Sequence, residues 1–177
     1  MLDLGRITTD DFKKKTKIPL LVILDNIRSM NNVGSIFRTC DAFAVEKLYL
    51  CGITATPPHK DITKTALGAT ESVEWEYVES VVELVCRLKE EGIKVYLIEQ
   101  TDNSVFLDRF QFFDGKTAII LGNEVFGVSE ELLPICDGAI EIPQYGTKHS
   151  LNVTIAAGIV IWEYYTTTPS TFFPISR

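Results

Sequence analysis

Residues 117–127 read TAIILGNEVFG, an apolar run that ends at Leu121 in a segment of glycine and polar residues. Four similar apolar runs occur elsewhere in the chain, and none alternates strictly between polar and apolar side chains. This pattern is typical of strands that are buried on both faces of a parallel sheet. The five predicted strands are residues 19–24, 47–51, 94–98, 117–121 and 139–142.

Three segments between or after these strands have the periodicity of helices. In residues 32–44 and 80–91, apolar side chains recur three and four positions apart, which predicts helices that pack one face on the sheet. Residues 151–165 are apolar on almost every side, which favours a buried helix or one packed in a subunit interface. Since strands and helices alternate, the predicted class is α/β, with a mostly parallel sheet covered by helices on both faces.

The same pattern predicts the organisation of the chain. We expect a basic segment over residues 1–19, one α/β domain over residues 20–165 and a short tail over residues 166–177. The tail contains three consecutive threonines and two prolines, so the last helix is not expected to continue into it. Residues 54–60, which contain two adjacent prolines, are expected to form a long functional loop.

The composition gives conflicting indications about whether RNA is a partner. A hydrophobic content of 46% excludes intrinsic disorder, and a net charge of −7 argues against RNA binding because phosphates need lysine and arginine. The charge is uneven, however, since residues 1–70 hold ten basic and seven acidic residues. A local basic patch therefore leaves RNA possible as a partner. The residues expected in this patch are Lys13, Lys14, Lys15, Lys17 and Arg28.

Metal, membrane and secretory functions find no support in the sequence. The four cysteines form no C-x-x-C pair and only His59 and His149 could complete a zinc site, so no bound metal is expected. No charged-then-apolar leader opens the chain, and the longest apolar stretch, residues 151–162, is interrupted by polar residues and glycine. We therefore expect no membrane span and a cytoplasmic, reducing location.

Polar segments follow the predicted strands, where α/β proteins usually bind ligands. Neither G-x-G-x-x-G nor a P-loop is present, but residues 122–127 place Glu124 directly after a strand. An ordinary strand-to-helix turn, with Glu124 favoured by the helix dipole, is the structural alternative. Residues 31–34 open a helix that carries Arg38, which is either a solvated residue or a cation placed beside a cleft.

The third polar segment comes before the last predicted helix. Ser150 could be the N-cap of that helix, and His149 is expected to be a loop residue. Asn152 lies among apolar residues, and a buried amide there would need partners across an interface or in a ligand.

Taken in order, these segments resemble the three motifs of the SpoU/TrmH family of RNA ribose methyltransferases. The first motif is an asparagine followed six positions later by an arginine, here Asn32 and Arg38. The second is G-x-E-x-x-G after a strand, and the third is I-x-I-P-x-x-G followed by S-L-N-V. They correspond here to Gly122, Glu124 and Gly127, and to Ile140, Ile142, Pro143, Gly146, Ser150, Leu151, Asn152 and Val153. One departure is Gln144, where the family typically has methionine.

The resemblance covers about residues 20–165 and implies a deep trefoil knot near the C-terminus, which fold statistics alone would exclude. It also implies a homodimer whose active site draws on both subunits. The implied reaction transfers a methyl group from S-adenosylmethionine to a ribose 2′-hydroxyl, with guanosine as the expected nucleoside. Residues 66–73 are similar to members that act on rRNA, but tRNA is slightly favoured because the frequent additional RNA-binding domain is missing.

The resemblance also implies a role for each residue. The cofactor would lie against the backbone of Gly122, Ile142 and Leu151. Arg38 would lie at the reacting centre, either as a general base or as a charged group that binds a phosphate and stabilises the developing alkoxide. The charged role is physically easier, because guanidinium groups remain protonated in proteins. The residues that would position ribose, Arg38 and the loops are Asn32, Glu124, Ser150 and Asn152.

Two alternative functions stay open. A knotted RNA-binding protein without turnover would share the fold, although it has no reason to keep all five polar residues of the motifs. Methylation of a base is the other alternative, and the S-L-N-V segment and the Asn-to-Arg spacing argue for the ribose instead. Binding of S-adenosylmethionine tests the first alternative, and resistance of the product RNA to alkali tests the second.

Overall fold

The computed structural model describes residues 7–148 and 150–167. Within these residues, seven strands form one sheet in the order β3-β2-β1-β6-β4-β7-β5, and every pair of neighbours is parallel. The predicted α/β class is therefore confirmed. The strands are β1 (Ile18–Asp25), β2 (Val45–Cys51), β3 (Trp75–Val78), β4 (Lys94–Ile98), β5 (Val105–Phe106), β6 (Thr117–Leu121) and β7 (Gly138–Glu141).

The five predicted strands agree with β1, β2, β4, β6 and β7 to within two residues at each end. The two strands that were not predicted, β3 and β5, form the two edges of the sheet. Neither contains a fully buried residue, so neither has the continuous apolar run that marks a central strand. Sequence pattern therefore detects the centre of this sheet and misses its edges.

The three predicted helices are α2 (Met30–Ala42), α5 (Val81–Glu90) and α6 (Val153–Thr167). Ser29 and Ser80 cap the first two, since each side-chain oxygen accepts the backbone N–H three residues later. Five further segments are too short to show an apolar period and were not predicted. They are α1 (Thr9–Lys14), α3 (Lys60–Ala66), α4 (Ala69–Ser72) and the 3-10 helices η1 (Leu107–Arg109) and η2 (Glu130–Leu132).

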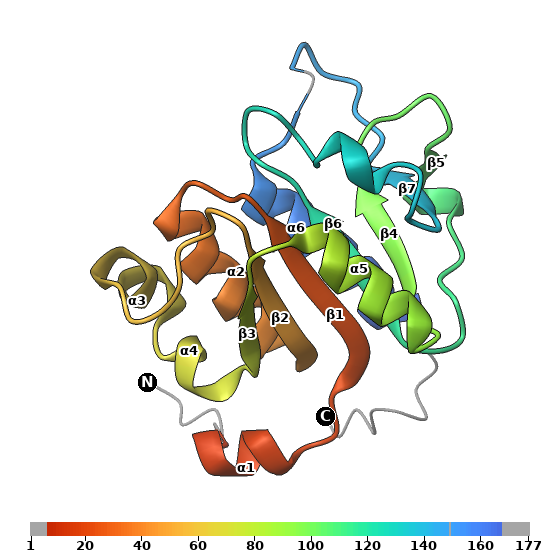
Figure 1. Cartoon of the computed structure of the whole chain (residues 1–177). Coiled ribbons are helices and arrows are strands. Elements are labelled where there is room, and N and C mark those ends of the chain that lie inside the picture. Colours follow the sequence, from red (N-terminus) through yellow and green to blue (C-terminus); the bar gives the residue numbers. More distant parts are fainter. Residues whose placement is uncertain (1–6, 149, 168–177) are drawn as a thin grey trace.

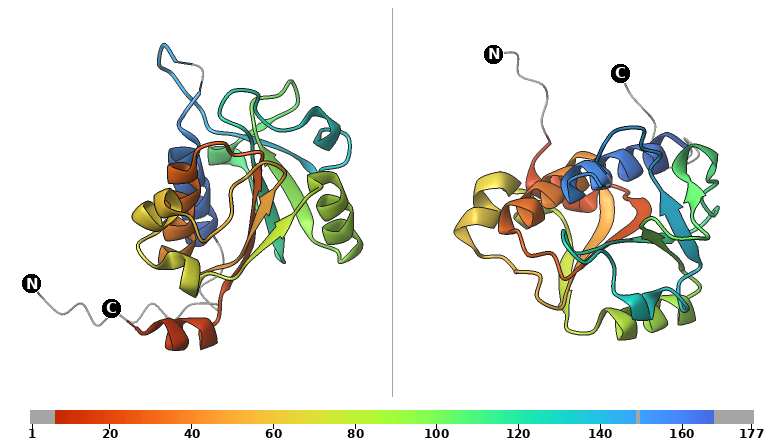
Figure 2. Two further views of the ribbon diagram at one scale, coloured as in Figure 1. Left: turned by 60° about the vertical axis from the view of Figure 1, so that its left-hand side comes forward. Right: turned by 90° about the horizontal axis from the view of Figure 1, so that it is seen from above.

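The helices cover both faces of the sheet, which gives the molecule three layers (Figures 1 and 2). On one face, α2, α3 and α6 bury a cluster that includes Phe37 and Ile161 against β1, β2 and β6. On the other face, α5 buries a second cluster that includes Leu84 and Leu88. Burial on both faces explains why the central strands are apolar throughout, and it leaves only the ends of the strands free to carry polar loops.

Helix α6 continues two residues beyond its predicted end. The hydroxyl groups of Thr166 and Thr167 donate hydrogen bonds of 3.1 and 2.7 Å to the carbonyl oxygen of Glu163. The expectation that the helix stops before Thr166 is wrong, because these threonines bond back to the preceding turn. Residues 1–6 of the basic segment, His149 and residues 168–177 of the tail lie outside the described residues.

One face of α6 is exposed although the helix is apolar. Ile155 is 54% and Trp162 is 52% exposed, and Ile159 lies between them on the same side. No other element of the described chain covers these three side chains fully. The opposite face packs on the core through Val153, Ala157, Val160 and Ile161.

Candidate active site

The carboxyl ends of β4, β6 and β7 lie at the same level of the sheet. Ile98 of β4 is in register with Leu121 of β6 and with Ile140 of β7. The residues that follow them therefore lie side by side at the upper edge of the sheet in Figure 1, where parallel sheets usually bind ligands. These residues are Glu99, Gly122 and Glu141.

A pocket of about 370 Å³ opens at this edge. Its walls come from the ends of β4, β6 and β7 and from the beginning of α6, and its volume is in the range of small-molecule sites. The structure thus brings together residues from the second and third motifs. Those that line the pocket are Gly122, Ile142 and Leu151, expected to bind the cofactor, together with Glu124 and Ser150.

The second motif forms a closed turn rather than the start of an α-helix. The backbones of Asn123 and Gly127 exchange two hydrogen bonds of 2.8 and 2.9 Å. Gly127 has a φ of 71°, which favours glycine, and a Cβ on Gly122 would lie 2.3 Å from the Gly127 backbone. The next element is the 3-10 helix η2, so the alternative of an ordinary strand-to-helix turn is wrong.

Glu124 joins the second motif to the first. Its carboxylate accepts hydrogen bonds from the backbone N–H groups of Arg28 and Ser29, at 3.0 and 3.1 Å, and from the Asn32 amide at 2.9 Å. Burial alone would raise the pKa of Glu124, but these hydrogen bonds outweigh it and lower the pKa below its ordinary value. Among the described contacts none joins Glu124 to Arg38, so Glu124 positions the amino end of α2.

Arg38 lies on the exposed side of α2 and does not line the pocket. It borders a separate groove of about 650 Å³ between α1, α2 and α4, together with Lys15 and Asp41. Within the described part of the chain, its guanidinium has no hydrogen bond or ion pair. A single chain therefore does not bring Arg38 to the pocket that Glu124 and Ser150 line.

Asn152 is exposed, so the expectation of a buried amide that needs a distant partner is wrong. Its side-chain oxygen accepts hydrogen bonds from the backbone N–H and the hydroxyl of Thr154, at 2.9 and 2.5 Å. Asn152 thus caps α6, which begins at Val153 and not at Leu151 as predicted. Ser150, considered as the cap, lies two residues earlier at the pocket.

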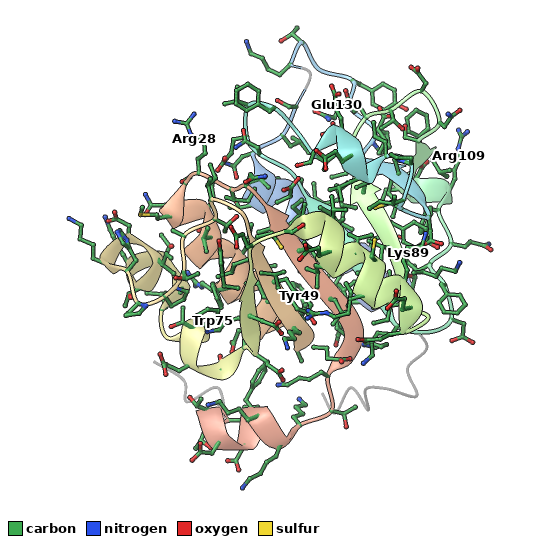
Figure 3. The ribbon with its side chains drawn as sticks, in the orientation of Figure 1. Arg28, Tyr49, Trp75, Lys89, Arg109 and Glu130 are labelled. Carbon is green, nitrogen blue, oxygen red and sulfur yellow. The ribbon has the colours of Figure 1, made fainter. Side chains whose placement is uncertain are left out.

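The predicted basic patch is divided between the two ends of the sheet. Lys13–Lys15 are exposed on and beside α1, at the end opposite the pocket (Figure 1). Lys17 is half-buried, with its ammonium 3.0 Å from the centre of the Phe12 ring, and desolvation lowers its pKa to about 8. Arg28 instead projects from the loop between β1 and α2, at the pocket end (Figure 3).

Two pocket residues, Glu99 and Glu141, were missed in the sequence. The Glu99 carboxylate accepts hydrogen bonds from the backbone N–H groups of Gln100 and Val128, at 2.9 and 3.3 Å. The Glu141 carboxylate accepts a hydrogen bond of 2.6 Å from the Ser104 hydroxyl. These donors are neutral, and the described lining residues include no lysine or arginine. The pocket therefore has an uncompensated negative charge. Glu99 directly follows the apolar run 94–98 and Glu141 interrupts the run 139–142, and these two acidic positions were the signal that could have identified both.

Residues 7–148 and 150–167 contain neither a metal-binding cluster nor a membrane-spanning helix. No group of three or more histidine, cysteine, aspartate or glutamate side chains there could hold a metal ion. None of the helices in these ranges has the length and apolar character needed to cross a membrane. The four cysteines are all free thiols.

Known proteins resemble this chain in sequence and in fold. The SpoU rRNA Methylase family matches residues 19–162. A tRNA (guanosine(18)-2′-O)-methyltransferase from Aquifex aeolicus is 34% identical over 85% of this chain and 70% of that protein. A 23S rRNA (guanosine-2′-O-)-methyltransferase RlmB from Vibrio vulnificus is 33% identical over 87% of this chain and 62% of that protein.

Two solved structures superpose closely on the chain. The A. aeolicus TrmH/SpoU tRNA modifying enzyme has a TM-score of 0.80 at 29% identity, over 90% of this chain and 81% of that one. An AdoMet-bound rRNA methyltransferase from Sinorhizobium meliloti has a TM-score of 0.78 at 25% identity, over 88% of this chain and 59% of that one. Because the family match spans the pocket and all three motifs, this chain belongs to the SpoU rRNA methylase family.

Proposed function

We propose that this protein transfers a methyl group from S-adenosylmethionine to the 2′-hydroxyl of a ribose, expected to be that of a guanosine, in RNA. The observation that carries the proposal is the pocket at the carboxyl edge of the sheet, where residues of the second and third motifs meet. Two relatives from A. aeolicus and V. vulnificus, named as guanosine 2′-O-methyltransferases of tRNA and 23S rRNA, support it.

The residues of the pocket fit S-adenosylmethionine. Ile142 and Leu151 offer apolar walls for the adenine, and backbone groups around Gly122 can approach it closely. The carboxylates of Glu99, Glu124 and Glu141 suit the sulfonium and ammonium groups of a cationic ligand. When bound, this cofactor supplies a methyl group on a positively charged sulfur, which is a good leaving group.

The residues of the chain must then orient the ribose, exclude water and manage the charge of the 2′-oxygen. We assign to Arg38 the charged role, in which it binds the phosphate beside the ribose and stabilises the alkoxide as it develops. The proton leaves to a phosphate oxygen or to water. Glu124 positions Asn32 through their 2.9 Å hydrogen bond, and Asn152 positions the segment with Ser150 by capping α6.

The active site is completed, in this proposal, by a second subunit. Arg38 lies outside the pocket of its own chain, and the helix that forms one pocket wall exposes Ile155, Ile159 and Trp162. A homodimer that covers this apolar face removes it from water and can carry Arg38 of one subunit to the pocket of the other. Trp162→Glu should therefore produce monomers in sedimentation experiments, and a wild-type protein that sediments as a monomer would contradict the dimer.

A deep trefoil knot is the finer part of the fold proposal. After β7, which is three places from β1 in the sheet, the chain returns to pack α6 on α2. The Tyr164 hydroxyl donates a 3.0 Å hydrogen bond to the carbonyl oxygen of Pro19, in β1. This return across the sheet is the path that threading through an earlier loop requires.

The test of the function is methyl transfer to two RNA pools, total tRNA and ribosomal RNA, each from cells that lack the gene. We expect transfer to tRNA. The methylated product should yield dinucleotides that resist alkali, because a 2′-O-methyl group blocks cleavage. In the cell, we expect the protein to act in a compartment that keeps its free thiols reduced. Label in alkali-sensitive nucleotides would indicate base methylation instead. Cofactor binding measured by calorimetry without transfer to either pool would favour the noncatalytic alternative.

A further inference from the structure

An exposed phenylalanine lies in the turn of the second motif. The Phe126 side chain is 82% exposed, and Ile53, in the loop after β2, is 67% exposed. Large apolar side chains usually lie inside a protein, and neighbouring exposed ones mark places where another molecule binds. The turn carries the residue that joins the first two motifs, Glu124, so this surface borders the proposed active site.

The backbone holds the Phe126 ring outward. The Asn123 side-chain oxygen accepts the N–H of Phe126 at 3.1 Å, and the Asn123 amide donates to the carbonyl oxygen of Asn26 at 2.6 Å. The Asn26 side-chain oxygen in turn accepts the N–H of Ile53 at 3.1 Å. The loops after β1, β2 and β6 are thus braced together. This hydrogen-bonded frame fixes the backbone that carries the exposed ring.

A groove of about 330 Å³ runs between these loops. Phe126, Ile53 and Arg28 line it, and it shares Asn123, Phe126 and Gly127 with the cofactor pocket. Arg28 projects into solvent beside it, while the Arg28 backbone N–H is fixed by Glu124 at 3.0 Å (Figure 3). An aromatic ring and a cation therefore flank a groove that shares part of its lining with the pocket.

We propose that this groove binds a nucleotide of the substrate RNA, with its base stacked on Phe126 and a backbone phosphate on Arg28. The proposal rests on the proposed function and names the residues that hold the RNA. Nucleic-acid bases stack on exposed aromatic rings, and phosphate matches the charge of the guanidinium. RNA is favoured over a second copy of the chain because the methyl acceptor must reach the pocket that Phe126 also lines.

The test compares Phe126→Ala with Val125→Ala, a matched control in the same turn whose side chain is 67% exposed. The RNA is the tRNA or rRNA pool that the wild-type protein methylates. We expect Phe126→Ala to raise the KM for RNA by about tenfold or more, and Phe126→Trp to restore it, whereas Phe126→Leu should not. The melting temperature should stay close to wild type. Both side chains line the cofactor pocket but only Phe126 lines the groove, so any change in the calorimetric Kd for S-adenosylmethionine should be the same in Phe126→Ala and Val125→Ala.

Arg28→Ala should raise the KM for RNA and reduce the slope of log affinity against log salt by about one. Stacking also has a spectroscopic signature: added RNA should quench the new tryptophan in Phe126→Trp and leave that in Val125→Trp unquenched.

Three results would overturn the proposal. The first is a KM for RNA in Phe126→Ala equal to that of the Val125→Ala control, in a protein that does methylate RNA. The second is a loss of cofactor affinity that accounts for the whole effect, which would assign Phe126 to the cofactor. The third is a change in sedimentation of Phe126→Ala, because a second copy would then cover the ring. A wild-type protein that methylates no RNA would instead refute the proposed function.

Discussion

Glu124 gives the sharpest test of how the loops at the carboxyl edge of the sheet are held together. Its carboxylate receives three hydrogen bonds from residues more than ninety positions earlier in the chain, two from backbone N–H groups and one from Asn32. Replacing it by alanine removes all three. Replacing it by glutamine keeps an oxygen for Ser29 and Asn32 but turns an amide N–H toward the N–H of Arg28, so at least one bond is lost.

The size of the effect follows from these contacts. Glu124 is exposed, so each hydrogen bond is given the ordinary net value of about 1 kcal/mol and not the larger value of a shielded charged bond. Glu124→Ala should then lower the free energy of unfolding by about 3 kcal/mol, and Glu124→Gln by about 1 to 2 kcal/mol. Asn32→Ala should cost about 1 kcal/mol alone and almost nothing when added to Glu124→Ala, because the two residues share one bond.

Urea unfolding and amide hydrogen exchange measure this directly. The amides of Arg28 and Ser29 should exchange faster in Glu124→Ala, since their only described acceptor is the missing carboxylate. Glu131→Ala is the control, because Glu131 is also exposed and its side chain has no hydrogen bond within the described residues. An unfolding midpoint of Glu124→Ala equal to that of the control, with unchanged exchange at both amides, would refute the reasoning.

Acid should remove the same contribution. The pKa of Glu124 lies below its ordinary value of 4.5, because the hydrogen bonds outweigh the partial desolvation of this exposed carboxylate. The folded state therefore holds its proton less tightly than the unfolded state, and the stabilisation is present above that ordinary value and lost as the pH falls through the lowered pKa. The difference in unfolding free energy between wild type and Glu124→Gln should shrink below pH 4.5.

Three further predictions concern charge. Arg38→Ala should lower methyl transfer by about 100- to 1,000-fold at saturating RNA, with the calorimetric Kd for S-adenosylmethionine within about twofold of wild type; near-normal turnover would exclude Arg38 from the reacting centre. Burial lowers the pKa of Lys17 from 10.5 to about 8, so the folded state holds fewer protons between these values. The stability of wild type relative to Lys17→Met should therefore rise with pH across that window, and parallel stability profiles would contradict the burial of this ammonium. Glu99→Gln and Glu141→Gln should each weaken binding of cationic S-adenosylmethionine by about fivefold and that of neutral S-adenosylhomocysteine much less. Calorimetry with both ligands measures the two affinities. An equal loss of affinity for S-adenosylmethionine and S-adenosylhomocysteine would mean that these side chains contribute through packing and not through their charge.

The central part of the fold could be predicted from the sequence, because burial requires a recognisable pattern of apolar residues. Strands covered on both faces must be apolar throughout, so β1, β4 and β6 were predicted to within one residue of their ends. The edge strands β3 and β5 carry half-buried or exposed residues, and α1, α3 and α4 are too short for a repeating period. Their positions depend on tertiary packing that no local pattern records.

The site was predictable as a set of motifs but not as a geometry. The order of Asn32, Glu124 and Ser150 pointed to one functional edge, whereas the bond between Asn32 and Glu124 joins residues 92 positions apart. Glu99 and Glu141 reach the pocket only because the register of β4 and β7 makes their ends level. For Asn152, a shift of two residues in the start of α6 changed a buried amide into an exposed cap.

The position of Arg38 outside its own chain's pocket has a genetic consequence. With the dimer proposed above, Arg38→Ala spoils the pocket of the partner, while Gly122→Val, which crowds the Gly127 backbone, spoils the pocket of its own chain. A mixed dimer that carries both changes in one subunit and neither in the other has no intact site. A mixed dimer with one change in each subunit keeps one intact site, which combines Gly122 of the first subunit with Arg38 of the second. Two inactive alleles should therefore complement each other when they are expressed together, which a site contained within one chain does not allow.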